Sequence, residues 1–284
     1  MARLLRGAPV AQALTLSLKP RVEALRDRGV VATLAIVRVG EGASDLSYER
    51  AARRRMDAVG IATKSIALSA DCSQAELTDA IDRVNEDAGI HGCLILRPLP
   101  RTLDERAACA ALDVAKDVDG VTAGSLYGMF ANRQVGFSPC TAEAVMKLLD
   151  YYGVELAGAK VTVVGRSLVI GKPVSMLLLA ADATPTLCHT HTRELAVACR
   201  DADVVVVAAG HAKVVGAAAV RAGQVIVDVG TNWDEEAGTL VGDVDFDAVE
   251  PKVAAITPVP GGVGAVTTAI LAKHVIEAAE GLIS

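Results

Sequence analysis

One stretch decides the fold that the sequence predicts: Val161-Thr162-Val163-Val164-Gly165-Arg166-Ser167-Leu168-Val169-Ile170-Gly171-Lys172-Pro173. Its first residues are apolar or β-branched and predict a buried strand, Gly165 allows a tight turn, and a helix is expected to follow. The two glycines would let the backbone approach a pyrophosphate, which the N-terminus of that helix would bind. The spacing is G-x-S-x-x-x-G rather than G-x-G-x-x-G, so this turn alone leaves open whether a dinucleotide binds there.

Apolar runs alternate with amphipathic stretches on both sides of this turn. Strands are expected near residues 33–39, 63–68, 92–96, 160–165, 184–188, 203–209 and 225–229, and helices near 44–59, 73–86, 141–152 and 267–282. Ser73 and Glu76 have the spacing of a capping box at the start of one of these helices. This alternation predicts an α/β fold with parallel, doubly wound sheets, and a boundary between domains falls near residues 135–142.

Composition narrows the class of protein. The chain has 284 residues, is 52% hydrophobic but only 3% aromatic, and carries a formal net charge of -6. A core of Ala, Val, Leu and Ile suits helices packed on buried parallel strands. The negative charge, with no basic block longer than Arg53-Arg54-Arg55, argues against nucleic acid as a partner. Six scattered cysteines without metal-ligand spacing indicate reduced, buried thiols. We see neither a signal peptide nor a membrane span, so a cytoplasmic protein is expected.

The end of the next strand bears on the choice of cofactor. Cys188 to Thr192 contain no carboxylate that could bind a ribose 2'-hydroxyl, whereas Arg166 can pair with a 2'-phosphate, which favours NADP over NAD. His189 and His191 could face one side, but no third metal ligand is visible, so no metal is expected. Asp228 is interpreted as a carboxylate that orients a loop. The candidate cofactor-binding residues are Gly165, Arg166, Ser167, Gly171, Thr190 and Thr231.

Six segments identify a family by their order and spacing. They are Gly40 to Tyr48, Lys116-Asp117-Val118-Asp119-Gly120, Pro139-Cys140-Thr141, Gly165-Arg166-Ser167, Gly242-Asp243-Val244 and Thr257 to Gly264. Several of them are weak signals alone, but together they span nearly the whole chain. In this respect the chain resembles the methylenetetrahydrofolate dehydrogenase/methenyltetrahydrofolate cyclohydrolase family of one-carbon metabolism.

The resemblance implies roles for particular residues. Tyr48 would stack on the aromatic middle of the folate, Asp119 would hydrogen-bond the pterin, and Pro260 to Gly264 would form the folate-side wall near the nicotinamide. Tyr48 and Asp119 are the candidate catalytic residues. The candidate substrate-binding residues are Tyr48, Ile95, Leu96, Arg97, Asp119, Pro260, Gly261, Gly262, Val263 and Gly264. Without the resemblance, Tyr48 could face the core and Asp119 could cap the turn before Gly120.

Two domains are expected, with a cleft between them. Residues 1–140 would form an α/β tetrahydrofolate-binding domain, and residues 141–266 would form a Rossmann-like NAD(P)-binding domain with a parallel sheet. The resemblance implies that the last helix, 267–284, packs back on the first domain. It also implies a homodimer through the cofactor domain, for which the Val- and Ala-rich strands 203–209 and 225–229 are suitable.

Two positions depart from the family. Its helix carries Tyr-x-x-x-Lys, but Ala52 stands four residues after Tyr48, and Leu96 stands where the family has a glutamine that positions the lysine. Arg53 is rotated roughly 100° around the helix from position 52. Arg97 follows Leu96, but adjacent strand residues face opposite sides.

These losses affect the two family reactions differently. Dehydrogenation moves a hydride from a carbon flanked by two nitrogens to the nicotinamide, so it needs alignment rather than a base. Cyclohydrolysis adds water to the methenyl cation and redistributes protons, which calls for a positioned acid/base group. A lysine with a lowered pKa could serve, whereas Ala52 and Leu96 cannot.

The preferred hypothesis is therefore an NADP-dependent methylenetetrahydrofolate dehydrogenase, an oxidoreductase with weak or lost cyclohydrolase activity. The alternative is a bifunctional dehydrogenase/methenyltetrahydrofolate cyclohydrolase in which Arg53, Arg97 or a solvent chain replaces the lysine. A second alternative is a non-catalytic folate- or nucleotide-binding homologue. An unrelated dehydrogenase of a hydroxy acid would need a His or Lys for the alcohol proton, and none of the five histidines suits that role; His91 and His274 are interpreted as surface or helix positions.

Overall fold

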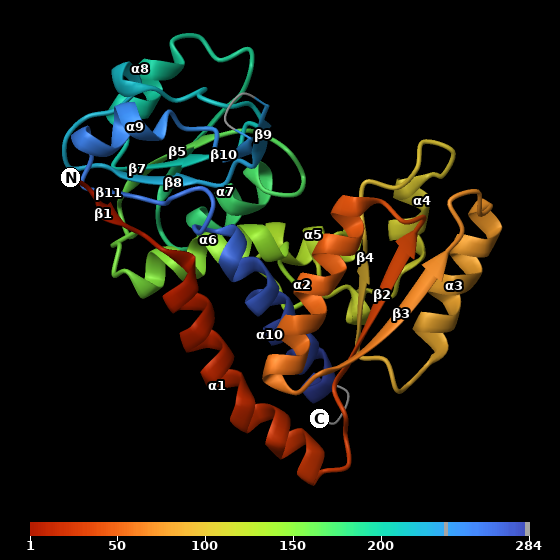
Figure 1. Cartoon of the computed structure of the whole chain (residues 1–284). Coiled ribbons are helices and arrows are strands. Elements are labelled where there is room, and N and C mark those ends of the chain that lie inside the picture. The colour runs from red at the N-terminus through yellow and green to blue at the C-terminus, as the bar shows by residue number, and fades with distance from the viewer. Residues whose placement is uncertain (236–237, 282–284) are drawn as a thin grey trace. The chain divides into compact units, whose positions relative to one another are not determined.

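A computed structural model describes residues 1–235 and 238–281 of the chain. The chain forms two compact units (Figure 1). One, which we call the six-strand unit, consists of Met1–Gln12 and Thr141–Thr267. The other, the three-strand unit, consists of Ala13–Cys140 and the chain from Thr268 onward. The α/β class and the parallel sheets predicted from the sequence are confirmed in both units.

The six-strand unit is built on a sheet in which every neighbouring pair of strands is parallel. In spatial order its strands are β1 (Arg3–Leu4), β11 (Ala255–Ile256), β8 (Val225–Asp228), β7 (Val204–Val207), β5 (Lys160–Val164) and β6 (Thr184–Cys188). The helical elements are α6 (Cys140–Tyr151), α7 (Gly171–Ala180), α8 (Leu195–Asp201), α9 (Phe246–Val249) and the single turns η2 (Ala217–Ala219) and η3 (Glu250–Lys252). A hairpin of β9 (Asn232–Asp234) and β10 (Thr239–Val241) follows β8.

Valine fills the centre of this sheet. All four residues of β7 are buried valines, and β5 and β8 pair with its two edges. Strands that are covered on both faces need apolar side chains at every position, which explains the continuous runs in the sequence. The surrounding core cluster also consists mainly of aliphatic side chains, among them Val205, Ile226 and Ile256.

The three-strand unit has a smaller parallel sheet with the order β3-β2-β4. Its strands are β2 (Thr33–Val39), β3 (Ala62–Leu68) and β4 (Gly92–Ile95). Its helical elements include α2 (Ala43–Val59), α3 (Gln74–Glu86), α4 (Glu105–Ala111), the turn η1 (Val114–Lys116) and α5 (Ala123–Phe130). The capping box predicted at Ser73 and Glu76 is present at the start of α3.

Lys116 closes the other end of α3. Its ammonium group donates hydrogen bonds to the carbonyl oxygens of Val84 (2.6 Å), Asn85 (2.8 Å) and Asp87 (2.8 Å). The last carbonyls of a helix have no partner within the helix, and a cation there also suits the helix dipole. The first residue of the Lys116 to Gly120 motif therefore has a structural role.

Two long helices run from one unit into the other: α1 (Gly7–Asp27) and α10 (Gly264–Gly281). The first was not among the predicted elements, although its buried residues Val10, Leu14, Leu18, Val22 and Leu25 recur every three or four positions. Pro20 inside this helix obscured the pattern, because proline is unfavourable in helix interiors. The second corresponds to the expected helix 267–284, of which residues 282–284 lie outside the described residues.

The first twelve residues differ from the expected division of the chain. The sequence places residues 1–140 together, whereas Met1–Gln12 belong to the six-strand unit. The reason is β1, which extends the six-strand sheet by pairing with β11 in the register Arg3↔Ala255. A two-residue strand leaves almost no pattern in a sequence, so this pairing could not be predicted.

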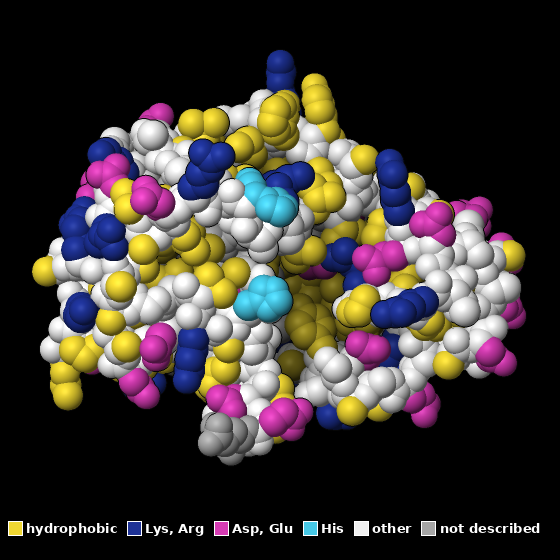
Figure 2. Space-filling model, turned by 90° about the horizontal axis from the view of Figure 1, so that it is seen from above, with side chains coloured by type: hydrophobic (Ala, Val, Ile, Leu, Met, Phe, Trp, Pro, Cys, Tyr) yellow, Lys and Arg dark blue, Asp and Glu magenta, His cyan; other side chains and the backbone are white. Residues whose placement is uncertain are grey.

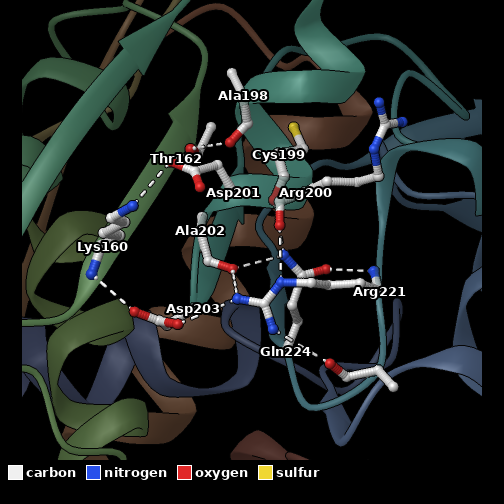
Figure 3. A network of polar contacts seen from close by, with 11 residues as sticks. Lys160, Thr162, Ala198, Cys199, Arg200, Asp201, Ala202, Asp203, Arg221 and Gln224 are labelled. Carbon is white, nitrogen blue, oxygen red and sulfur yellow. Dashed lines mark hydrogen bonds and ion pairs between the residues drawn. The ribbon is translucent and has the colours of Figure 1, made fainter.

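A polar network holds the C-terminal end of α8 (Figure 3). The side-chain amide nitrogen (Nε2) of Gln224 donates hydrogen bonds to the backbone carbonyl oxygens of Cys199 and Ala202, each at 2.7 Å. The guanidinium of Arg221 donates to the same carbonyl of Ala202 at 2.9 Å and pairs with Asp203. These side chains satisfy helix carbonyls that lack intrahelical partners.

The surface carries mixed charge. Figure 2 shows Lys and Arg side chains interspersed with Asp and Glu and with hydrophobic side chains over the face in view. Within residues 1–235 and 238–281, no helix combines the length and the apolar composition that crossing a bilayer requires. All six cysteines are buried free thiols, as their spacing predicted.

Candidate active site

Helix α2 positions the first group of site residues in the three-strand unit. Its buried face consists of Glu49, Ala52, Met56 and Val59, at helical spacing. Tyr48 lies one turn before Ala52 and keeps 37% of its surface exposed, whereas Ala52 is completely buried. The aromatic ring is thus accessible to a ligand, and the position where the family carries lysine is closed to solvent.

Arg53 is held away from position 52 by its neighbours. Its Nε lies 3.3 Å from a carboxylate oxygen of Glu49, and its guanidinium also contacts Ser65 in β3. The other carboxylate oxygen of Glu49 accepts a 3.0 Å hydrogen bond from Arg38 in β2. Arg53 therefore belongs to a polar cluster between α2 and the sheet.

The second arginine considered, Arg97, follows the end of β4 and lies beside two carboxylates. Leu96 is buried and its N–H still bonds to Val37 of β2 at 2.9 Å, but β4 itself ends at Ile95. The Arg97 guanidinium lies 3.6 Å from Asp119 and 3.5 Å from Glu105. Arg97 thus lies beside Asp119, as a candidate for the same site, and the alternation expected for Leu96 and Arg97 applies only as far as the strand itself, which ends at Ile95.

Asp119 is a part-buried carboxylate in the loop after η1. Burial raises its pKa to about 6, while the charge of Arg97 and a hydrogen bond with Cys140 oppose that rise. The alternative role of capping the following turn belongs to Asp117, whose carboxylate accepts the N–H groups of Val121 (3.0 Å) and Thr122 (2.7 Å). The interactions of Asp119 are instead with the side chains of Arg97, Cys140 and His274.

Tyr48 belongs to the same group of side chains. Desolvation, the Asp119 carboxylate and the Cys140 thiol together raise the pKa of its phenol, and Arg97 opposes them. The structure thus places three of the candidate residues, Tyr48, Arg97 and Asp119, near one another. Glu105 and Cys140 are additional members that the sequence analysis missed, since neither has a local pattern that points to this group.

The two histidines next to this loop are buried rather than exposed. His274 lies in α10, donates from Nδ1 to the carbonyl oxygen of Val118 at 2.8 Å, and stacks on Phe137. His91 precedes β4, and its Nδ1 accepts the N–H of Thr33 at 3.3 Å. His274 lies in a helix, which is one of the two expected positions, but neither histidine lies at the surface, and their contacts are structural.

In the six-strand unit, the predicted turn after β5 needs glycine for steric reasons. Gly165 has φ +125°, and a Cβ there would lie 2.0 Å from the carbonyl oxygen of Ala208. A Cβ at Gly171 would lie 2.1 Å from the carbonyl oxygen of Gly165. Both glycines let α7 begin directly against the sheet. The exposed Arg166 and Ser167 lie between them.

The remaining candidates follow the carboxyl ends of other strands of the six-strand sheet. Thr190 follows β6, Thr231 follows β8, and Pro260 to Gly264 follow β11. Because these strands are parallel, their carboxyl ends meet at one edge of the sheet, where open α/β sheets bind ligands. Gly261 adopts φ +101° and accepts a 2.8 Å hydrogen bond from the N–H of Gly7.

Arg166 lies near the end of β6. Desolvation and the positive charge of Arg166 lower the pKa of His189. The His189 Nδ1 accepts the backbone N–H of His191 at 3.1 Å, and their rings meet edge to face. A cation therefore lies beside the segment where the ribose of a dinucleotide is expected.

Two buried aspartates order the loops at this edge. Asp228 accepts the N–H groups of Gly230, Asp243 and Val244 at 2.9–3.0 Å, which confirms its interpretation as a loop-orienting carboxylate. Asp243 accepts the N–H groups of Ala209 (2.6 Å) and Gly210 (2.8 Å) after β7. Its role was not predicted, because its partners lie over thirty residues away in the sequence.

Two family descriptions match the chain. The catalytic domain of tetrahydrofolate dehydrogenase/cyclohydrolase matches residues 5–119, and the NAD(P)-binding domain of the same enzyme matches residues 139–282. The chain belongs to the tetrahydrofolate dehydrogenase/cyclohydrolase family. The family predicted from the ordered motifs is thereby confirmed.

Individual members of the family resemble the chain over its full length. A protein named bifunctional protein FolD from Carboxydothermus hydrogenoformans is 46% identical over 281 residues, 99% of this chain and 98% of that protein. The solved bifunctional FolD methylenetetrahydrofolate dehydrogenase/cyclohydrolase from Campylobacter jejuni has a TM-score of 0.96 at 34% identity, covering 99% and 100% of the two chains. The enzyme from Trypanosoma brucei, solved with NADP and an inhibitor, has a TM-score of 0.93 at 34% identity, covering 99% and 98%.

The family assignment matches the two groups of candidates. The matched catalytic domain contains Tyr48, Leu96, Arg97 and Asp119, and the matched NAD(P)-binding domain contains the turn at Gly165 and the segment Pro260 to Gly264. The chain is thus an enzyme of this family, with a folate as substrate and a nicotinamide dinucleotide as cofactor.

Proposed function

We propose that this chain oxidises 5,10-methylenetetrahydrofolate to 5,10-methenyltetrahydrofolate with NADP as hydride acceptor. The observation that carries the proposal is the group formed by Tyr48, Arg97 and Asp119 in the three-strand unit. An exposed aromatic ring beside a part-buried carboxylate offers a stacking surface and a hydrogen-bond acceptor to the pterin and the ring that follows it.

The proposed roles follow from the chemistry of each group. Tyr48 would stack on the folate, and Asp119 would accept N–H groups of the pterin and fix its orientation. Pro260 to Gly264, Ile95 and Leu96 would contribute to the substrate site as the family resemblance implies. Hydride transfer from a carbon between two nitrogens needs no base, so positioning is the contribution that these residues make.

NADP is the proposed cofactor because of Arg166 and the segment after β6. A guanidinium can pair with a 2'-phosphate, and Cys188 to Thr192 offer no carboxylate to the 2'-hydroxyl that NAD carries. Thr190, Thr231, Ser167 and the two glycines of the turn would line the remainder of the site. The bound NADP of the Trypanosoma brucei relative supports this choice.

A cyclohydrolase activity is the second candidate function. The relatives named bifunctional support it, and they favour the bifunctional alternative over a chain that has lost this activity. Ala52 and Leu96 argue for a slow cyclohydrolase reaction, because neither side chain can accept or donate a proton. Of the two arginines considered as replacements, Arg53 is engaged by Glu49 and Ser65, and Arg97 lies beside Asp119.

Two assays of one purified protein test these functions separately. Methylenetetrahydrofolate with NADP should give NADPH, measured by its absorbance, and NAD should be the poorer acceptor. Methenyltetrahydrofolate supplied alone should decay faster than in buffer if the enzyme is bifunctional. Binding of both ligands without any NADPH would instead support a non-catalytic homologue.

We further propose a cytoplasmic homodimer. The six free cysteines suit a reducing compartment. Strands 203–209 and 225–229 cannot offer an edge to a second copy, because β7 and β8 are paired on both sides within the sheet. The edge strand β6 exposes Thr184, Thr186 and Leu187, and a surface hollow of about 420 Å³ beside it is lined by β5, β6 and α8. This edge is therefore the proposed contact.

A further inference from the structure

The side chain that the family motifs did not explain is Arg97. It comes from the exit of β4, keeps 20% of its side chain exposed, and lies between two carboxylates, Asp119 at 3.6 Å and Glu105 at 3.5 Å. Glu105 is itself fixed, because its second carboxylate oxygen accepts the N–H of Leu99 at 3.0 Å. A continuous polar chain thus leads from the loop after β4, through Glu105 and Arg97, to Asp119.

The separation between Arg97 and Asp119 matters. At 3.6 Å the two charges attract, but the distance exceeds the 2.7–3.2 Å range of N–H···O hydrogen bonds. The guanidinium therefore stabilises the carboxylate without occupying its lone pairs. A ligand with N–H donors could still bind those oxygens, as the proposed function requires of Asp119.

We propose that Arg97 is a positioning residue of the folate site, which keeps Asp119 ionised and oriented toward the pterin while Glu105 anchors Arg97. The proposal rests on the function proposed above and assigns to Arg97 a task that no family motif gives it.

The surroundings of Asp119 show why such a charge is needed. Burial alone favours the protonated acid, and Asp117 on the same loop adds a second negative charge nearby. Tyr48 from α2, Cys140 from α6 and His274 from α10 also interact with it, but Arg97 is the largest opposing influence. With the pKa of Asp119 raised to about 6, loss of Arg97 would leave a large fraction protonated near neutral pH.

The test compares five variants of the full chain. R97Q removes the charge, R97K keeps it, E105Q removes the anchor, and D119N removes the carboxylate. K64M breaks the exposed Lys64–Asp87 pair of the same unit as a matched control. For each we would measure kcat and KM for methylenetetrahydrofolate at saturating NADP from pH 5 to 9. Binding of 5-formyltetrahydrofolate and of NADP by calorimetry, with thermal unfolding, separates site effects from misfolding.

For R97Q we expect a roughly tenfold higher KM for the folate, little change in kcat, and an acid limb of kcat/KM moved about one pH unit upward. The sign follows because Asp119 must be ionised, and loss of a nearby cation raises its pKa. R97K should restore most of the acid limb, E105Q should fall between R97K and R97Q, and K64M should match the unmodified chain. D119N should abolish the acid limb altogether.

Three outcomes would overturn the inference about Arg97 while leaving the proposed function intact. In an active enzyme, R97Q could keep the KM and the acid limb of kcat/KM of the unmodified chain, or D119N could keep that acid limb. The third outcome is that the effects of R97Q merely follow a loss of folding. Unmodified chain that neither reduces NADP nor binds 5-formyltetrahydrofolate would instead overturn the proposed function, and the inference with it. NADP binding should be unchanged in every variant.

Discussion

At the residue scale, position 52 is where we propose that the requirements of the two family reactions differ. Its side chain is a methyl group, completely buried on the inner face of α2 one turn after Tyr48. A lysine introduced there would be desolvated, which lowers the pKa of an ammonium toward neutrality and suits it to proton transfer. The same burial means that the larger side chain must find room, so Leu96 has to be changed with it.

The double variant A52K/L96Q should raise the rate of methenyltetrahydrofolate hydrolysis by about a hundredfold, within the range typical of a general acid/base. Dehydrogenase activity should change little, because hydride transfer needs no such group. The measurement is decay of methenyltetrahydrofolate, with L96Q alone as control. Unmodified chain that already hydrolyses it as fast as the double variant would refute the argument from position 52.

Arg166 is the second residue whose charge has a specific consequence. Arg166→Gln should raise KM for NADP by roughly ten- to a hundredfold, as expected for loss of a charge-assisted pair with a phosphate, and should leave KM for NAD nearly unchanged. Initial rates with both cofactors measure the effect. R193Q, which changes another arginine near β6, is the matched control. Equal losses with NAD and NADP would show that Arg166 does not recognise the 2'-phosphate.

At the element scale, several of the polar residues that the sequence singled out form hydrogen bonds with backbone groups and thereby stabilise the fold. Lys116 closes α3, Asp117 caps the loop before α5, and Asp228 and Asp243 order the loops after β7 and β8. The sequence suggested this role for Asp228 but did not separate Asp117 and Asp243 from Asp119, since a carboxylate in a glycine-containing loop has the same pattern in both roles. Only the partner of each oxygen distinguishes them.

Lys116→Met should lower the free energy of unfolding by about 2–4 kcal/mol, because one buried and two part-buried carbonyl oxygens at the end of α3 lose their donor. Urea denaturation followed by circular dichroism measures it. K64M, at an exposed ion pair of the same unit, should cost at most about 1 kcal/mol. Equal stabilities of the two variants would contradict the assigned role of Lys116.

At the scale of the whole molecule, the open edge of the six-strand sheet is the feature with a testable consequence. A charge on an edge strand opposes pairing with another chain. Leu187→Lys in β6 should therefore convert a dimer into a monomer at micromolar concentration, as measured by sedimentation velocity. Val31→Lys, at an exposed position of the three-strand unit, should leave the dimer intact. An unmodified chain that sediments as a monomer would refute the homodimer itself.

The sequence by itself determined the α/β class, the parallel strands, the turn at Gly165 and the family, because buried strands and tight turns impose local patterns that a chain displays directly. Its local pattern also contained α1, which we missed because of Pro20. It could not place β1 with β11 or show that Arg97 reaches Asp119. Those features depend on partners distant in sequence and on where a strand stops. Only the tertiary structure decides them, because the direction and charge environment of a side chain are set by what folds against it.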